Sequence, residues 1–267
     1  MTGPGILALT TDFGTDGPYV AALKGVILSL APDAKIVDVS HAIAPQNVLE
    51  GAFVLAEVVD AFPAGTVHLG VVDPGVGTSR RLIASRIGGH WFVVPDNGLI
   101  TGAARLRHPE VIHEITNPLL RRPTVAPTFH GRDILAPAAA HLLLGGDPAD
   151  LGPVLADFVT LRNFRPSEDE AGLIGEVIYR DVFGNLITNI AADQLVACPD
   201  HSWTIEIAGQ HIAGLTLTYG DGPTGALIAL IGGTGWLEVA VVNGDAGQQL
   251  SAGPGTTIWA RRATRPT

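Results

Sequence analysis

Runs of apolar residues alternate with short polar breaks along the N-terminal part of the chain. Some runs are short and continuous, which is typical of buried strands, while others repeat every three or four residues, which is typical of helices. The expected strands are residues 6–11, 35–39 and 67–72, and the expected helices are residues 18–30 and 47–61. This alternation of strand and helix predicts a parallel sheet with crossover helices.

The following segments continue this pattern with a hairpin and two further helices. Gly88 and Gly89 separate the apolar runs 82–87 and 91–95, which predicts two antiparallel strands. A helix to about residue 105, a strand at 111–115 and a helix to residue 144 are expected next. Pro137 lies inside the last helix, where proline removes a backbone donor, so this position departs from the usual rule.

The character of the sequence changes near residue 160. Residues 161–172 are polar and charged and include Pro166, which predicts a linker. Short alternating strands separated by glycine-rich turns are expected beyond it, at 173–179, 186–190, 203–207, 226–231, 236–242 and 256–260. We therefore expect an α/β domain with a mostly parallel sheet at 1–160 and a smaller all-β, barrel-like domain at 173–267.

The most informative stretch is 71–81, where an apolar strand ends at Asp73. Gly75 and Gly77 allow a tight turn, and Arg80 returns a permanent positive charge toward the Asp73 carboxylate. Open α/β sheets bind ligands beyond the C-terminal ends of their strands, which makes this loop a candidate site. A turn carrying an ordinary surface ion pair explains the same residues.

Other polar residues at the ends of predicted elements are candidates with simpler alternatives. Asp12 ends the first strand, and such a carboxylate either accepts hydrogen bonds from ribose hydroxyls or caps the following helix. His130 either accepts a proton near neutral pH or is an exposed histidine before a helix. Asp38 and His41 have no third ligand at a suitable spacing, so we expect no metal site there.

The segment 181–185 joins two expected strands of the β domain. It is interpreted either as an ordinary hairpin turn or as part of a nucleoside site. In the second interpretation, Asn185 offers a donor and an acceptor that match an adenine edge, and the Phe183 ring can stack on the base.

Composition and charge restrict the possible functions. The 267-residue chain is 46% hydrophobic and 16% charged, so it can bury a sizeable core. Its net charge of −10 argues against nucleic-acid binding. Cys198 stands alone, which fits a reducing cytoplasm, and we expect neither a signal peptide nor a membrane span. Motifs typical of P-loop proteins, dinucleotide-binding folds, zinc proteases and serine hydrolases are missing from the sequence.

Taken together, six motifs give the chain a specific resemblance. They are TTDFG at 10–14, DVSH at 38–41, VDPGVGTSR at 72–80, PDNG at 95–98, TFHGRD at 128–133 and DVFGNLITN at 181–189. In this order, they resemble the S-adenosyl-L-methionine hydrolases, or hydroxide adenosyltransferases, which are relatives of fluorinase and chlorinase. The resemblance covers nearly the whole chain and implies a Rossmann-like N-terminal domain, a C-terminal β domain and a homotrimer with active sites between subunits.

The resemblance also implies an activity and a set of site residues. The expected reaction cleaves S-adenosylmethionine at the 5′ carbon to adenosine and L-methionine, without a metal or redox cofactor. The water-positioning set of the family falls on Asp73, Arg80 and His130. The substrate-binding positions of the family fall on Asp12 at the ribose, Phe183 and Asn185 at the adenine, and additionally Asn97 and Asp181.

Two alternatives remain open at the level of sequence. The halogenases resemble this chain but carry tyrosines where Asp73 and His130 stand, and a tryptophan at the position of Gln46. A carboxylate repels a bound halide at close range, so Asp73 favours water over halide as the nucleophile. An adenosyl halide synthase and a non-catalytic sensor of S-adenosylmethionine or adenosine are the alternatives to the hydrolase.

Overall fold

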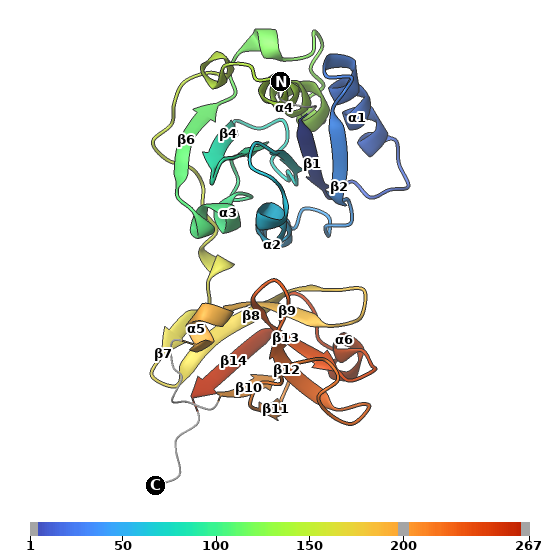
Figure 1. The fold of residues 1–267 in the computed structure, drawn as a ribbon, viewed down its shortest axis with the longest axis vertical. Coiled ribbons are helices and arrows are strands. Elements are labelled where there is room, and N and C mark those ends of the chain that lie inside the picture. Colours follow the sequence, from blue (N-terminus) through green and yellow to red (C-terminus); the bar gives the residue numbers. More distant parts are fainter. Residues whose placement is uncertain (1–4, 197–202, 263–267) are drawn as a thin grey trace. The chain divides into compact units, whose positions relative to one another are not determined.

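The computed structural model describes residues 5–196 and 203–262, so Cys198 lies outside the described residues. The chain divides into two compact units, Met1–Leu161 and Arg162–Thr267 (Figure 1). Each unit has its own sheet and its own hydrophobic core. Within the described part of the chain, no helix combines the length and the apolar composition needed to cross a bilayer.

A six-stranded sheet forms the centre of the N-terminal unit, with the strand order β2-β1-β3-β5-β4-β6. Its strands are β1 Ile6–Thr11, β2 Lys35–Ser40, β3 Val67–Val71, β4 Leu82–Ile87, β5 His90–Pro95 and β6 Pro109–Glu114. Strands β2, β1, β3 and β5 run parallel, while β4 runs antiparallel to both β5 and β6. This mostly parallel sheet confirms the predicted α/β class, and the expected hairpin is the β4–β5 pair.

Helices cover both faces of this sheet (Figure 1). Helices α1 (Tyr19–Leu30) and α4 (Ala136–Leu143) pack on one face, and α2 (Val48–Val58) and α3 (Thr101–Leu106) pack on the other. Successive strand residues point to opposite faces, so Val93 of β5 belongs to the first core while Phe92 and Val94 belong to the second. The short helical turns of this unit are η1 Val59–Ala61, η2 Pro118–Leu120 and η4 Pro148–Leu151.

The order of the strands predicts a ligand-binding position beyond the C-terminal ends of the central strands β1 and β3. From β1 the chain crosses to β2 on one side, whereas from β3 it continues to β4 and β5 on the other side. Open α/β sheets bind ligands where neighbouring connections diverge in this way. Thr11 pairs with Val71, so Asp12 and the Asp73 loop leave the sheet next to each other.

A π-helical turn, Gly131–Leu135 (η3), accounts for the proline that departs from the helix rule. The Ala136 N–H bonds to the Gly131 carbonyl, five residues earlier, and Pro137 then lies in the first turn of α4, where its missing donor is tolerated. The Asp133 carbonyl, which residue 137 would bond in a regular α-helix, instead accepts the Arg122 N–H at 2.9 Å. Single π-turns of this kind are frequent at functional sites.

The C-terminal unit is an antiparallel sheet with the order β11-β10-β14-β8-β9-β13-β12, and β7 pairs with β8. Its strands are β7 Ser167–Asp169, β8 Gly172–Arg180, β9 Leu186–Ala191, β10 Trp203–Ile207, β11 Gln210–Ala213, β12 Leu227–Ile231, β13 Trp236–Val241 and β14 Thr257–Arg262. Helical segments are η5 Arg162–Phe164, α5 Ala192–Val196 and α6 Ala246–Leu250. This nearly closed sheet confirms the expected barrel-like β domain.

Some elements of the C-terminal unit are not evident from the pattern. Strand β7 lies in the segment expected as a linker, where its charged residues Glu168 and Asp169 hide a strand that pairs with β8. Strand β11 is short and mostly exposed. Neither strand carries the apolar alternation on which a prediction from sequence depends.

Candidate active site

Three side chains that are distant in sequence meet at the C-terminal edge of the N-terminal sheet. Arg80 donates from Nε to Asp73 Oδ1 at 2.6 Å and from Nη2 to Asp73 Oδ2, which forms a bidentate ion pair. The same Nη2 lies 3.2 Å from Nδ1 of His130. The side chains of Asp73 and Arg80 are only 5% and 10% exposed, so this is a desolvated pair and not the ordinary surface ion pair of the alternative interpretation.

Two glycines let the segments that carry these groups approach one another. Gly77 has a φ of +80°, and a Cβ there would lie 2.7 Å from the carbonyl oxygen of Pro127. At Gly131, a Cβ would lie 2.9 Å from Cγ1 of Val71 at the end of β3. Because glycine has no side chain, the Asp73 loop can pack against Pro127 at Gly77, and the segment after His130 can pack against the end of β3 at Gly131.

The contact with Arg80 determines the protonation state of His130. A guanidinium only donates hydrogen bonds, so His130 Nδ1 accepts and the imidazole is neutral, with its proton on Nε2. Burial lowers the pKa of His130 below its ordinary value of 6.5, and the charge of Arg80 lowers this pKa further, although Asp73 opposes both effects. At neutral pH, His130 therefore presents an Nε2–H donor.

A small cavity of about 70 Å³ lies beside these groups. The residues that line it include Asp12, Phe13, Asp73, Phe129 and His130. Oδ2 of Asp12 accepts the N–H of Gln46 at 2.8 Å, whereas α1 begins after Pro18 without any side-chain cap. Asp12 is therefore not the helix cap of the alternative interpretation, and it shares the cavity with Asp73 and His130.

Two aromatic side chains, Phe13 and Phe129, line this cavity, and Tyr19 packs on both of them. The rings of Phe13, Tyr19 and Phe129 pack on one another with centroids 5.7 to 6.0 Å apart. The guanidinium of Arg132 lies 4.6 Å from the centroid of the Phe129 ring. The position of Phe13 directly after Asp12 was the signal in the sequence that could have marked it as a site residue. Tyr19 and Phe129 contact Phe13 only because α1 packs against the π-turn.

A second carboxylate close to His130 was also missed as an organising residue. The side chain of Asp133 is fully buried and accepts two hydrogen bonds from Arg132, at 2.7 and 2.8 Å, and one from Arg122 at 3.1 Å. It also accepts the Ala126 N–H at 2.8 Å. Asp133 therefore holds the loop before His130 to the π-turn that follows it.

The predicted residue Asn97 lies near the Asp73 loop and makes contacts within the chain. Its Nδ2 donates to the carbonyl of Val72 at 2.8 Å, and its Oδ1 accepts the N–H of Leu99 at 3.3 Å. The first bond connects the end of β5 with the residue that precedes Asp73, and the second closes the turn at Asn97 itself.

The remaining predicted residues belong to the C-terminal unit, in the turn between β8 and β9. Asp181 Oδ1 accepts the N–H groups of Phe183 and Asn185 at 2.9 and 2.8 Å, and its Oδ2 accepts Nδ2 of Asn185 at 2.9 Å. Asn185 is buried, whereas Phe183 is 74% exposed. The segment is thus a hairpin turn closed by Asp181, and this turn presents a large aromatic ring to solvent.

The pair Asp38 and His41 is satisfied by neighbouring side chains. Asp38 pairs with Nζ of Lys24 at 2.6 Å and with Nε2 of His41 at 3.0 Å. Nδ1 of His41 lies 2.8 Å from Oγ1 of Thr11. Among residues 5–196 and 203–262, no group of three or more His, Cys, Asp or Glu side chains is arranged to hold a metal ion.

Family models match both units of the chain. The description "SAM hydroxide adenosyltransferase N-terminal domain" matches residues 7–152, and "SAM hydroxide adenosyltransferase C-terminal domain" matches residues 175–259.

Known proteins resemble the chain over most of its length. An (R)-S-adenosyl-L-methionine hydrolase of Thermus thermophilus is 40% identical, covering 93% of this chain and 96% of its own. A fluorinase of an Actinoplanes species is more distant, at 32% identity over 70% of this chain and 72% of its own. The crystal structure of an uncharacterized conserved protein from Thermotoga maritima superposes with a TM-score of 0.89 at 37% identity, covering 96% of this chain and 100% of that protein.

Proposed function

The chain belongs to the SAM hydroxide adenosyltransferase family, and from this we propose that it hydrolyses S-adenosyl-L-methionine to adenosine and L-methionine. The observation that carries the proposal is the meeting of Asp73, Arg80 and His130 beside a cavity that Asp12 also lines. The Asp73–Arg80 pair is desolvated, His130 contacts it through Arg80, and all three residues lie where α/β sheets bind ligands.

The chemical task of the site is to supply a nucleophile. The substrate already contains a good leaving group, because a neutral thioether departs from a sulfonium. In the proposed step, the water oxygen bonds to C5′ while the C5′–S bond breaks and its electron pair moves to sulfur. Water has a pKa near 15.7, so it must lose a proton to a nearby base as it attacks. Hydroxide and sulfonium neutralise each other in the transition state, which a water-poor site favours.

The contacts at the site suggest how the three residues divide this work. Arg80 holds the Asp73 carboxylate in place and stabilises negative charge that develops on the attacking oxygen. Nδ1 of His130 already accepts from Arg80, so Nε2–H is available to orient the water as a donor. The lone pairs of Asp73 that Arg80 does not use can accept the proton, which makes this carboxylate the proposed base.

We assign the substrate contacts by the same proposal. Asp12 binds the ribose hydroxyls, Phe183 stacks on the adenine, and Asn185 hydrogen-bonds the adenine edge. Asn97 and Asp181 act in this proposal by holding the Asp73 loop and the 181–185 turn, as their internal hydrogen bonds suggest.

We also propose that the enzyme is a cytoplasmic homotrimer that takes no cofactor and binds neither nucleic acid nor membranes. The family resemblance supports the trimer, and the net charge of −10 supports the exclusion of nucleic acid. Light scattering coupled to size-exclusion chromatography tests the trimer, and a monomeric mass would contradict it.

Product analysis tests the main proposal directly. Purified protein is incubated with S-adenosylmethionine in ¹⁸O-labelled water, and the products are separated and weighed by mass spectrometry. We expect adenosine that carries the label in its 5′ hydroxyl, together with unlabelled methionine. Substrate that stays intact would instead indicate a sensor.

Parallel reactions with excess chloride or fluoride address the halide alternative, which the fluorinase relative makes worth testing. We expect the halides to leave the product unchanged, because the Asp73 carboxylate repels an anion at the attacking position. A 5′-halo-5′-deoxyadenosine product would assign the chain to halide chemistry.

A further inference from the structure

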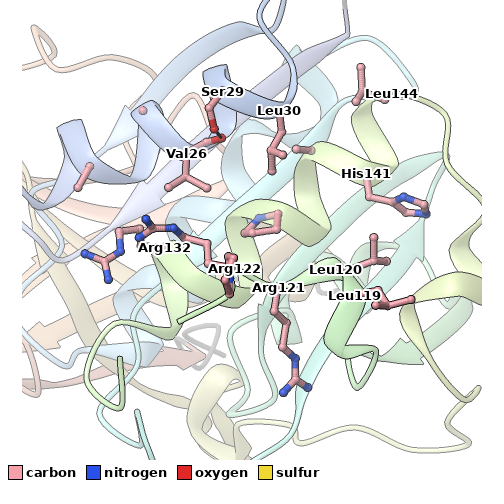
Figure 2. A pocket seen from close by; sticks show the side chains of 15 residues that line it. Val26, Ser29, Leu30, Leu119, Leu120, Arg121, Arg122, Arg132, His141 and Leu144 are labelled. Atoms are coloured by element: carbon pink, nitrogen blue, oxygen red, sulfur yellow. Dashed lines mark hydrogen bonds between the residues drawn. The ribbon is translucent and has the colours of Figure 1, made fainter. Parts of the chain in front are cut away.

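A cleft separate from the small cavity lies in the N-terminal unit, between α1, α4 and the segment that follows η2. Its volume is about 720 Å³, which falls within the range of pockets that hold drug-sized ligands. Figure 2 shows Val26 and Leu30 of α1 bordering it together with His141 of α4 and Leu144, the residue that follows α4. None of the residues of the proposed hydrolytic site lines this cleft.

The wall of the cleft is largely apolar and open to solvent. Its larger apolar side chains are Val26, Leu30, Leu119, Leu120, Pro137 and Leu144. Three of these are unusually exposed for leucine: Leu30 at 47%, Leu144 at 65% and Leu119 at 87%. Apolar surface concentrated in a concave region typically marks a binding site.

Three arginines, Arg121, Arg122 and Arg132, add positive charge to this wall (Figure 2). Asp133, which is fully buried, pairs with Arg122 and Arg132 but not with Arg121. Arg121 donates from Nη2 to two backbone carbonyls, and its Nε has no hydrogen-bond partner among the described residues. Three guanidiniums facing one carboxylate leave an excess of positive charge on a protein that is acidic overall.

His141 occupies another part of the wall, and its environment opposes an anion there. Nε2 of His141 lies 3.0 Å from the Asp147 carbonyl and 3.5 Å from Oδ2 of Asp150. The end of the cleft near Asp150 is thus negatively polarised, while the arginines are positive. The charges on the wall therefore fix the orientation of a ligand: its anionic group would lie near Arg121 and its apolar part along Leu30 and Leu144.

We propose that this cleft binds a small anionic amphiphile, a carboxylate attached to an acyl chain. The carboxylate lies near Arg121 and Arg122, where the positive charge of the two guanidiniums attracts it. The acyl chain lies along Leu30 of α1 and Leu144 after α4, where it removes their exposed surface from water. This inference does not depend on the hydrolase proposal, because no residue of the hydrolytic site takes part.

Calorimetric titration with two amphiphiles of equal chain length tests both parts of the inference. The full-length protein is titrated with decanoate and, separately, with decyltrimethylammonium, each kept below its micelle-forming concentration. We expect decanoate to bind at least about tenfold more tightly, because the guanidiniums attract its carboxylate and repel the ammonium group. Equal affinity for the two, or no binding of decanoate, would overturn the inference.

Three variants locate the binding. Arg121→Gln removes a guanidinium that does not contact Asp133 and should weaken decanoate binding about tenfold. Gly25→Leu adds a side chain to the cleft wall of α1, where a Cβ meets nothing within 4 Å; it should abolish binding without loss of fold. Arg86→Gln, which removes one positive charge from strand β4 outside the cleft, should leave the affinity unchanged.

The same variants distinguish binding of the amphiphile in this cleft from binding elsewhere and from contact with a second copy of the chain. If Gly25→Leu still binds decanoate with unchanged affinity, the ligand binds elsewhere and the inference fails. If decanoate does not bind and Gly25→Leu instead changes the oligomeric mass measured by light scattering, the cleft is an interface between copies of the chain.

Discussion

Two carboxylates of the N-terminal unit, Asp73 and Asp133, are both buried and both paired with arginine, yet their surroundings differ. Asp133 accepts four hydrogen bonds, three from guanidiniums and one from a backbone N–H. Asp73 accepts two from the part of the chain that the structure describes, both from Arg80, and it lines a cavity. A carboxylate has about four lone-pair sites, so Asp133 is saturated and Asp73 is not.

This difference separates a structural ion pair from a reactive one. A saturated carboxylate can only hold its partners in place, whereas an unsaturated carboxylate beside a cavity can bind and deprotonate a ligand. Whether a buried carboxylate is structural or reactive therefore depends more on how many of its lone pairs remain free than on the distance to its arginine partner. The predictions below test this contrast, beginning with the largest expected effect.

Replacing Asp73 by Asn should lower the rate of adenosine formation about 10³-fold, because the proposed base is lost while the side-chain volume is kept. Single-turnover kinetics followed by chromatography measures the rate, and calorimetry with S-adenosylmethionine checks that the variant still binds. A variant that retains the wild-type rate would remove Asp73 from the mechanism and with it the contrast.

Replacing His130 by Ala should lower the rate about 10²-fold, since the site loses the Nε2–H donor but keeps the Asp73–Arg80 pair. His130→Gln is the matched variant, because its amide can restore a donor, and it should recover part of the lost rate. Equal rates for His130→Ala and the wild type would show that the imidazole does not act on the water.

Replacing Asp133 by Asn should reduce the free energy of unfolding by on the order of 2 kcal/mol, because hydrogen bonds from charged donors are lost. Urea unfolding followed by circular dichroism measures this change. The rate of adenosine formation at a temperature where the variant is folded should fall by less than about tenfold. A large loss of rate with unchanged stability would break the contrast between the two carboxylates.

The two clusters should also separate on a pH scale. Burial and Arg80 lower the pKa of His130 below 6.5, so kcat/KM should be constant near neutral pH and fall only as the pH drops through this lowered value. Replacing Arg80 by Gln should move the acidic limb of the profile to higher pH, because the positive charge that disfavours imidazolium is gone. An unchanged limb would show that another group controls the profile.

Stability should follow a different pH dependence. Burial raises the pKa of Asp133, but hydrogen bonds from Arg132, Ala126 and Arg122 outweigh this effect and hold the pKa below 3.8. The contribution of Asp133 to stability is therefore complete above pH 3.8 and is lost only as the pH falls through its lowered pKa in the folded protein. The stability difference between the wild type and Asp133→Asn should therefore stay constant from about pH 7 to 5.

A comparison of variants is needed for this measurement because another group titrates in the same range. Burial and the neighbouring His90 lower the pKa of His68 to about 4. Both the wild type and Asp133→Asn should therefore lose stability as the pH falls from 6.5 toward 4, since the unfolded state binds the proton first. This loss cancels in the difference between them.

The smallest expected effect concerns the C-terminal unit. Asn185→Ala should weaken adenosine binding about tenfold, because an adenine edge would lose its paired hydrogen bonds. Calorimetry with adenosine measures the affinity. Asn185 also bonds Asp181, so unfolding in urea should be measured in parallel, and equal adenosine affinity with lower stability would assign Asn185 to the turn alone.

Much of the fold could be predicted because its signals are local. The run 6–11 is β1 as predicted, and Asn47 caps α2 by accepting the Glu50 N–H. The predictions were incomplete where the hydrophobic pattern is weak, as in β7 and β11. These two segments are strands because they pair with β8 and β10, and their own residues do not indicate it. Pro137 seemed misplaced because the π-turn that accommodates it depends on contacts with Arg122, distant in the chain.

The main strands and helices, the two-unit organisation and the chemical groups on each loop can be derived from the sequence alone, because they follow from periodicity, turn residues and side-chain type. The folded structure was needed to show that Asp73, Arg80 and His130 lie together, that His130 is held as a neutral donor, and that Asp133 is saturated while Asp73 is open. Those properties depend on distances between segments that lie far apart along the chain, and such distances exist only once the sheet has brought the ends of its strands together.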